Sequence, residues 1–215
     1  AELGVSEIRI DSNRLFIGVI RDVTERKRTE KKLRENAEQL QSYFDTTQAE
    51  QHLAMTLMEK QLHRKGLQDE CLRYTVLPAA HFSGDIVSAA RSDDGHSFYA
   101  LLADATGHGL AAAISVLPIL TVFYQMAHLK RPVSEIIAEL NFQLRESVPV
   151  GRFVAATLVC LDATRLQGEI WVGGTPKVLL FDRWGRLEQS FESTRLPLGI
   201  VANDQLGPSP VPFSW

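Results

Sequence analysis

A long stretch without helix-breaking residues constrains this chain more than any other feature. No Gly or Pro occurs from Glu25 to Lys65, and Glu, Lys, Arg, Gln and Leu dominate the stretch. That composition favours a continuous helix, and Gly66 directly after it is a natural helix stop. The sequence therefore predicts three parts: residues 1–24, a helix over residues 25–66, and residues 67–215.

Apolar residues recur along this helix at alternating spacings of four and three, as in a coiled-coil seam. A solvated linker helix that packs on its own chain is one interpretation. However, a helix this long needs a partner for its apolar stripe, so we expect a parallel homodimer through residues 25–65. The seam consists of Leu33, Ala37, Leu40 and Phe44, continues in polar form at Thr47 and Gln51, and resumes at Ala54 and Met58.

Residues 1–24 have the composition of β-strands. The run Leu15–Ile20 is β-branched and aromatic, and the turn residues Asp11, Ser12 and Asn13 precede it. So short a segment cannot bury a core alone. It is therefore an appendage or the end of a larger domain.

Beyond residue 66 strand and helix patterns mix. The strands are expected mostly as hairpins, which favours an α+β fold with antiparallel sheets and helices packed outside. We expect strands at 72–77, 84–92, 97–104, 153–162, 168–173 and 177–182, and helices at 108–127 and 133–147. In the second helix one apolar face consists of Val133, Ile136, Ile137, Leu140 and Leu144.

One hairpin places two carboxylates together. Asp94-Gly95 is a strong signal for a two-residue hairpin loop. With that loop, paired residue numbers sum to 189, and Asp85 lies directly opposite Asp104. Their Cβ atoms would then be roughly 5 Å apart on one face of the hairpin.

Two like charges at such a position are destabilising, and the neighbouring Val87, Leu101 and Leu102 predict little water there. Either one carboxyl is protonated or a cation lies between them. Oxygen ligands suit Mg²⁺ or Mn²⁺. The alternative is that both carboxylates only cap turns beside glycines. Three histidines are weaker candidates for chemistry: His108 as a general acid or a turn cap, and His81 and His96.

The overall composition excludes several functions. A net charge of -3 and a pI near 6.1 predict no attraction to nucleic acid or anionic membranes. We expect no membrane span and no signal peptide in this chain. With only Cys71 and Cys160, a disulfide framework is not expected, and a cytoplasmic location is.

These motifs resemble the SpoIIE-type branch of the protein phosphatase 2C-like (PPM) family. Gly84-Asp85 matches the family's Gly-Asp motif, and Asp104 to Gly109 matches its Asp-x-x-Gly-His-Gly motif. Trp171 to Pro176 stands, with divergence, in place of an Ala-Gly-His-Asn-Pro-like turn. Leu196 to Ile200 matches a Leu-Pro-Leu-Gly-Ile-like segment. The resemblance covers about residues 67–215.

The resemblance implies a β-sandwich flanked by helices and a site for two Mn²⁺ or Mg²⁺ ions. By position, Asp104 would bridge both ions, Asp85 would bind one, and the backbone carbonyl of Ala105 would complete the ligand set. The implied activity is hydrolysis of phosphoserine or phosphothreonine by a metal-activated water, without a covalent phosphoenzyme. The implied partner is a phosphorylated regulatory protein in bacterial signalling, such as an anti-sigma-factor antagonist.

The sequence departs from the family pattern in one respect. The family has a further metal-binding Asp in an Asp-Gly motif after the Leu-Pro-Leu-Gly-Ile segment. No such motif occurs before Trp215, and Asp204 stands too early to match it. We therefore expect the phosphatase domain to be C-terminally incomplete, to bind one metal weakly and to turn over slowly.

The N-terminal segment has a resemblance of its own. Gly18 to Lys27 is similar to the last strand of a PAS sensor domain and its Asp-x-Thr exit. Residues 1–24 would then be the C-terminal strands of a PAS domain, followed by a signalling helix.

Two other functions fit parts of the pattern. A histidine kinase would use Asp104 to Gly109 as an ATP box and His63 as phosphoacceptor. Against it, no Asn occurs between Arg64 and Ala103, and the residue after His63 is not acidic. A non-catalytic phosphatase-like module that binds a partner is the stronger alternative.

Overall fold

The computed structural model describes residues 1–10, 13–62, 65–77, 83–207 and 209–215. It separates into two compact units, Ala1–His52 and Leu53–Trp215. The boundary between the units lies inside helix α1 (Thr24–Leu62). The domain boundaries expected from the sequence, after residues 24 and 66, are not tested by this division and stay predictions.

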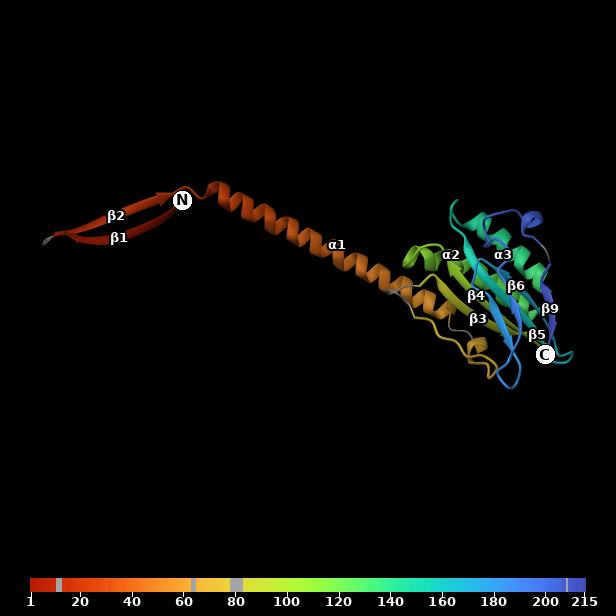
Figure 1. Ribbon diagram of the computed structural model, residues 1–215. Helices are drawn as coiled ribbons and strands as arrows, with labels where there is room; N and C mark the ends of the chain where they lie inside the picture. Colours follow the sequence, from red (N-terminus) through yellow and green to blue (C-terminus); the bar gives the residue numbers. More distant parts are fainter. Residues whose placement is uncertain (11–12, 63–64, 78–82, 208) are drawn as a thin grey trace. The chain divides into compact units, whose positions relative to one another are not determined.

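The first unit consists of a hairpin and most of α1 (Figure 1). Strands β1 (Glu2–Ile10) and β2 (Asn13–Arg21) pair along their whole length, which agrees with the predicted strand character. The expected turn residues Asp11 and Ser12 lie outside the described residues. Helix α1 ends at Leu62, before the predicted stop at Gly66.

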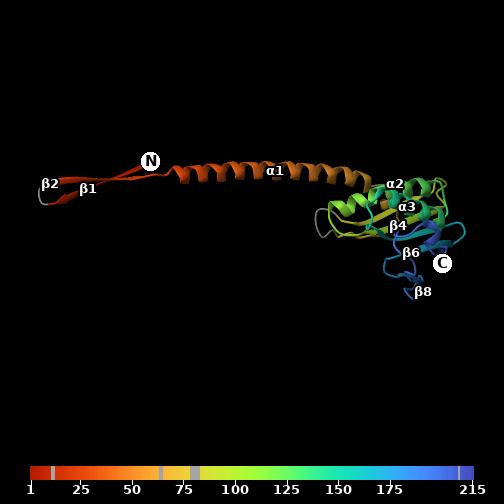
Figure 2. The ribbon, with the colours of Figure 1, turned by 90° about the horizontal axis from the view of Figure 1, so that it is seen from above.

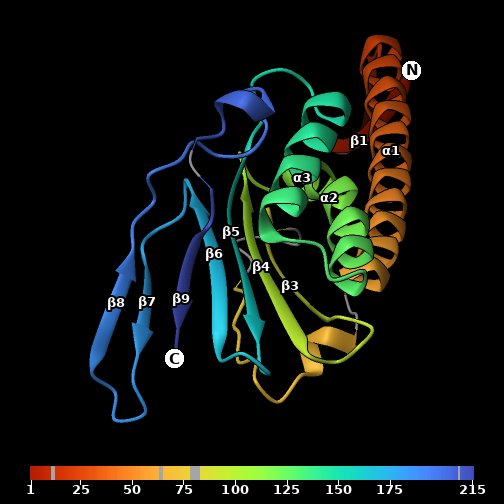
Figure 3. The ribbon, with the colours of Figure 1, turned by 90° about the vertical axis from the view of Figure 1, so that its right-hand side faces the viewer.

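A five-stranded antiparallel sheet forms the centre of the second unit, in the order β3-β4-β5-β6-β9 (Figure 3). Five predicted strands and both predicted helices of this unit are present within a few residues of their expected bounds. The sheet consists of β3 (Asp85–Arg91), β4 (Ser97–Ala105), β5 (Val154–Asp162), β6 (Gln167–Gly173) and β9 (Val211–Ser214). The second unit also contains two short 3-10 helices, Lys65–Gln68 and Asn203–Gln205.

Helices α2 (Leu110–His128) and α3 (Val133–Ser147) cover one face of this sheet (Figure 2). The predicted apolar face of α3 is buried along its length. By length and composition alone α2 could cross a membrane, contrary to the expectation that no segment could. Nine of its residues are nevertheless buried with the sheet and α3, as in the core helix of a globular unit.

The other face of the sheet is covered only in part. Strands β7 (Val178–Phe181) and β8 (Leu187–Phe191) form a separate hairpin on the side away from the helices (Figure 2). Phe191 of β8 is buried with Ile170 and Val172 of β6. The fold is therefore α+β with antiparallel sheets, as predicted, and the second layer of the expected sandwich is this two-stranded hairpin.

One predicted strand is absent, and two observed strands were not predicted. Residues 72–77 form no strand, because strand propensity depends on the packing context and does not decide the structure by itself. Strands β8 and β9 were not predicted. β9 contains Pro212, which lowers strand propensity, and pairs with β6 across a separation of about forty residues in the chain.

Candidate metal centre

The β3–β4 hairpin has the register that the sequence predicts. Asp85 pairs with Asp104 and Arg91 pairs with Phe98, so the paired numbers sum to 189. The loop is longer than the expected two residues. Asp94 accepts hydrogen bonds from the Ser92 hydroxyl and the His96 amide, and this local bonding closes the turn without shifting the register.

Asp85 and Asp104 lie at one end of the hairpin, on the face that the helices do not cover. Both residues are exposed. The expectation of a dry surrounding is wrong in two respects: Leu101 is buried on the opposite, helix-covered face, and Leu102 on the carboxylate face is 44% exposed. Alternation along a strand explains this separation. Only knowledge of which face the helices cover assigns each residue to its side.

The two carboxylates influence each other. Partial burial raises the pKa of Asp104 above its usual value, and the negative charge and hydrogen bonding of Asp85 raise it further. The carboxylate of Asp85 also accepts a hydrogen bond from the Ser83 hydroxyl, whose oxygen accepts the Asp85 amide at 3.0 Å. Ser83 thus fixes the orientation of Asp85, a role that the sequence analysis missed although the Ser-x-Asp spacing is typical of such a turn.

Gly84 brings the third predicted ligand close to this pair. The Ala105 amide donates to the Gly84 carbonyl at 3.2 Å. A β carbon on Gly84 would stand 2.9 Å from the Ala105 carbonyl oxygen and 3.1 Å from the Cβ of Ala112 in α2. Only glycine fits at this distance. Because Gly84 has no side chain, β3 can lie close to the end of β4 and to the start of α2.

The segment from Thr106 to Gly109 connects the site to α2. The Thr106 hydroxyl donates to the Phe153 carbonyl at 2.8 Å and accepts the Phe153 amide at 3.1 Å. Gly107 and Gly109 have φ values of 92° and 75°, in the left-handed region. His108 between them is exposed, as is His96. His81 lies outside the described residues, as do His63 and the side chain of Met58.

The donor set fits a hard divalent cation. Two facing carboxylates and an adjacent backbone carbonyl provide oxygen ligands of the kind that Mg²⁺ and Mn²⁺ prefer, and a cation would remove the repulsion that raises the pKa of Asp104. The set is small. Among the residues that the structure describes, no cluster of three or more His, Cys, Asp or Glu side chains could hold a metal ion.

Comparisons with known proteins agree with this reading of the fold. The sequence profile described as Stage II sporulation protein E (SpoIIE) matches residues 94–214, more than half of the chain. A comparison with curated proteins found no match.

Several solved structures are similar, and two of them are described here. The SiaA-PP2C domain of Pseudomonas aeruginosa has a TM-score of 0.61 at 15% identity, over 80% of this chain and 68% of that one. The RsbU and RsbW domains of a Mycobacterium tuberculosis protein give 0.52 at 20% identity, over 66% of this chain. Only 37% of that second chain is covered, and at these identities the likeness concerns the fold.

Proposed function

This chain belongs to the family of Stage II sporulation protein E (SpoIIE), and on that premise we propose that residues 67–215 form a metal-dependent protein phosphatase domain. The substrate we propose is phosphoserine or phosphothreonine on a regulatory protein, such as an anti-sigma-factor antagonist. The observation that carries the proposal is the pairing of Asp85 with Asp104 at the open end of the hairpin.

Each residue of the site has a distinct part in the proposed reaction. The carboxylates of Asp85 and Asp104 and the carbonyl of Ala105 would hold Mn²⁺ or Mg²⁺. Ions bound there supply a water of lowered pKa and neutralise charge that develops on the phosphoryl group. Ser83 orients Asp85 through its hydrogen bonds, and Thr106 holds the backbone after Asp104 against Phe153.

The exposure of both carboxylates supports a protein substrate. Asp85 and Asp104 are open to solvent, so a phosphorylated side chain on the surface of another protein can approach them without opening of the fold. The domain would then act within a partner-switching signalling system.

Calorimetric titration of Mn²⁺ and hydrolysis of a phosphoserine peptide test this function. We expect Asp104→Asn to abolish Mn²⁺ binding and peptide hydrolysis, and Asp85→Asn to weaken both. Asp204→Asn is the matched control, because it removes an exposed carboxylate elsewhere in the same unit. Unchanged binding in both site variants would refute the two-carboxylate centre.

A non-catalytic module that binds a phosphoprotein remains the second candidate. The observation in its favour is the small ligand set: in the described part of the chain only two carboxylates meet at the site, with no third acidic, His or Cys side chain beside them. A module of this kind would bind the phosphopeptide without Mn²⁺ and would release no phosphate.

The first unit suggests how the domain is controlled. Both faces of the β1–β2 hairpin carry exposed apolar side chains, including Val5, Phe16 and Val19, and an isolated two-stranded hairpin is marginally stable in water. This supports its assignment as the end of a PAS sensor domain. The Asp22 carboxylate accepts hydrogen bonds from the Thr24 amide and hydroxyl and so joins β2 to the start of α1.

The seam of α1 supports a parallel dimer. Leu33, Leu40 and Phe44 are 69%, 74% and 58% exposed, while ion pairs at i,i+4 spacing such as Arg26–Glu30 and Arg34–Glu38 stabilise the helix itself. Within the described residues of the first unit, no other segment buries this apolar stripe. A second copy of the helix, packed against the stripe, would bury it.

A further inference from the structure

Asn141 is a polar side chain within the apolar core of the second unit. It stands on the buried face of α3 and is 0% exposed. Its amide group donates to the Val201 carbonyl at 3.0 Å and to the side-chain oxygen of Asn203 at 2.7 Å, and its own oxygen accepts the Gly199 amide at 2.8 Å. A buried amide costs free energy unless its polar atoms are bonded. These three bonds, rather than apolar packing, therefore account for an asparagine at this position.

The segment around Gly199 lies against the start of β5. Leu198 and Val154 exchange two backbone hydrogen bonds, of 2.8 and 2.9 Å, and both side chains are buried. A β carbon on Gly199 would stand 3.4 Å from the Arg152 carbonyl oxygen and 3.6 Å from the Cα of Phe153. Gly199 is thus in contact with the backbone that leads into β5.

The start of β5 borders the candidate metal centre. Val154 pairs with Ala105, whose carbonyl is the third proposed ligand. The Phe153 backbone is bonded in both directions to Thr106, the next residue along β4. Hydrogen bonds and close contacts therefore lead from Asn141, through the segment that it holds, to the backbone at the metal centre.

We propose that Asn141 is a positioning residue for the metal centre. By holding the Gly199 amide, it fixes the start of β5, and the start of β5 sets where the Ala105 carbonyl stands relative to the two facing carboxylates. Groups that hold metal ligands in place typically change metal affinity by about tenfold or more when they are removed. The inference rests on the proposed function, because it takes the Ala105 carbonyl as a ligand.

Calorimetric titration of Mn²⁺ into the full chain tests this role. Asn141→Ala should weaken Mn²⁺ binding by about tenfold. Asn203→Ala should leave it unchanged, because this variant removes one partner of the same side chain and keeps the bond to Gly199.

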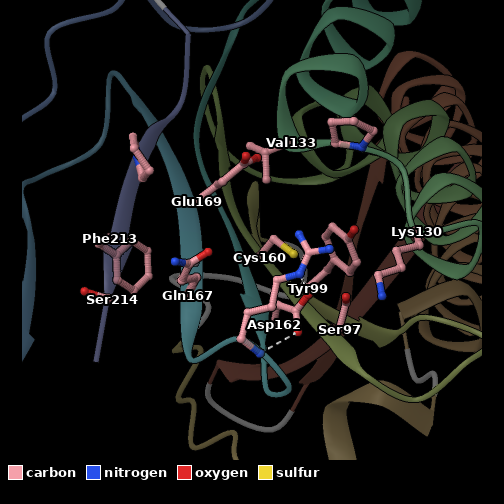
Figure 4. Close-up of a pocket in the computed structure, with 14 residues that line it drawn as sticks. Ser97, Tyr99, Lys130, Val133, Cys160, Asp162, Gln167, Glu169, Phe213 and Ser214 are labelled. Carbon is pink, nitrogen blue, oxygen red and sulfur yellow. Dashed lines mark hydrogen bonds and ion pairs between the residues drawn. The ribbon is translucent and has the colours of Figure 1, made fainter.

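Val133→Ala is the control for lost core packing. Val133 is buried on the same helix, but it stands beside a groove at the other end of the sheet from the carboxylate pair (Figure 4). Its truncation should lower the free energy of unfolding, measured with urea, and leave the Mn²⁺ affinity unchanged. A purely structural role of Asn141 would give the same pattern in Asn141→Ala.

Amide hydrogen exchange in the metal-free chain tests the mechanical link without any metal. The amides of Thr106 and Val154 donate two of the hydrogen bonds along this path. In Asn141→Ala both should exchange faster relative to the amide of Leu101 in the central part of β4. In Val133→Ala this ratio should not change.

Several outcomes would overturn the proposal. They are an unchanged Mn²⁺ affinity in Asn141→Ala, an equal loss of affinity in Val133→Ala, and an unchanged exchange ratio. If circular dichroism shows that Asn141→Ala is unfolded, Asn141→Ser takes its place, since its hydroxyl oxygen stands one bond nearer the helix than the amide oxygen. A wild-type chain that binds no Mn²⁺ contradicts the proposed function and this proposal with it, whereas wild-type binding that Asn141→Ala retains contradicts the positioning role alone.

Discussion

Replacing Asp104 by Asn should have opposite effects on stability with and without metal. In the metal-free protein, Asp104 faces the carboxylate of Asp85 directly across the hairpin, and this repulsion contributes to the raised pKa of Asp104. Asparagine has nearly the same shape and no charge. Asp104→Asn should therefore increase the free energy of unfolding when EDTA is present at neutral pH.

The size of this gain follows from the geometry. Directly opposed residues have Cβ atoms roughly 5 Å apart, and two unit charges at 4 Å repel by about 1 kcal/mol in water and by about 4 kcal/mol near a protein surface of lower dielectric. Because both side chains reach solvent, we expect the lower end, about 1 kcal/mol.

With Mn²⁺ the order should reverse. A ligand at a hundred times its Kd stabilises the folded state by about 2.7 kcal/mol. The wild-type chain should gain this amount and Asp104→Asn should gain none, so that the wild type becomes the more stable protein by about 2 kcal/mol.

Urea unfolding followed by tryptophan fluorescence measures both effects in the relevant unit. All three tryptophans, Trp171, Trp184 and Trp215, belong to the second unit, so the signal reports on that unit and not on the N-terminal hairpin. Asp204→Asn is the control. The reasoning is refuted if Asp104→Asn is less stable than the wild type in EDTA. It is also refuted if Mn²⁺ increases the free energy of unfolding of Asp104→Asn as much as that of the wild type.

The other predictions concern the packing at the site, one ion pair and the helix. Gly84→Ala should destabilise the second unit by about 1 to 3 kcal/mol through overpacking and weaken Mn²⁺ binding, as seen by the same fluorescence assay and by calorimetry. Asp69→Asn should cost about 1 to 2 kcal/mol, because Asp69 accepts two hydrogen bonds from Arg91. Since Arg91 lowers the pKa of Asp69 below 3.8, this stabilisation should be complete above about pH 4 and disappear as the pH falls through the folded-state pKa; urea titrations at several pH values measure it. Leu40→Glu with Phe44→Glu should convert a dimer to a monomer with the Mn²⁺ affinity unchanged, and sedimentation equilibrium decides it: a wild-type chain that is monomeric at micromolar concentration contradicts the coiled-coil seam.

The sequence by itself determined those structural elements that depend only on residues close together in the chain. The Asp94-Gly95 turn lies midway between Asp85 and Asp104, and strand pairing propagates residue by residue from a turn, so the register could be predicted without knowledge of the rest of the fold. The position of α3 followed from the helical period of its apolar residues in the same way.

Tertiary structure alone decided which surface each residue occupies. Alternation separates Leu101 from Leu102 and Asp104, but it does not indicate which set the helices cover, because either face of a hairpin can pack against them. Strand formation also depends on tertiary context: residues 72–77 did not become a strand, whereas β9 did, because it pairs with β6.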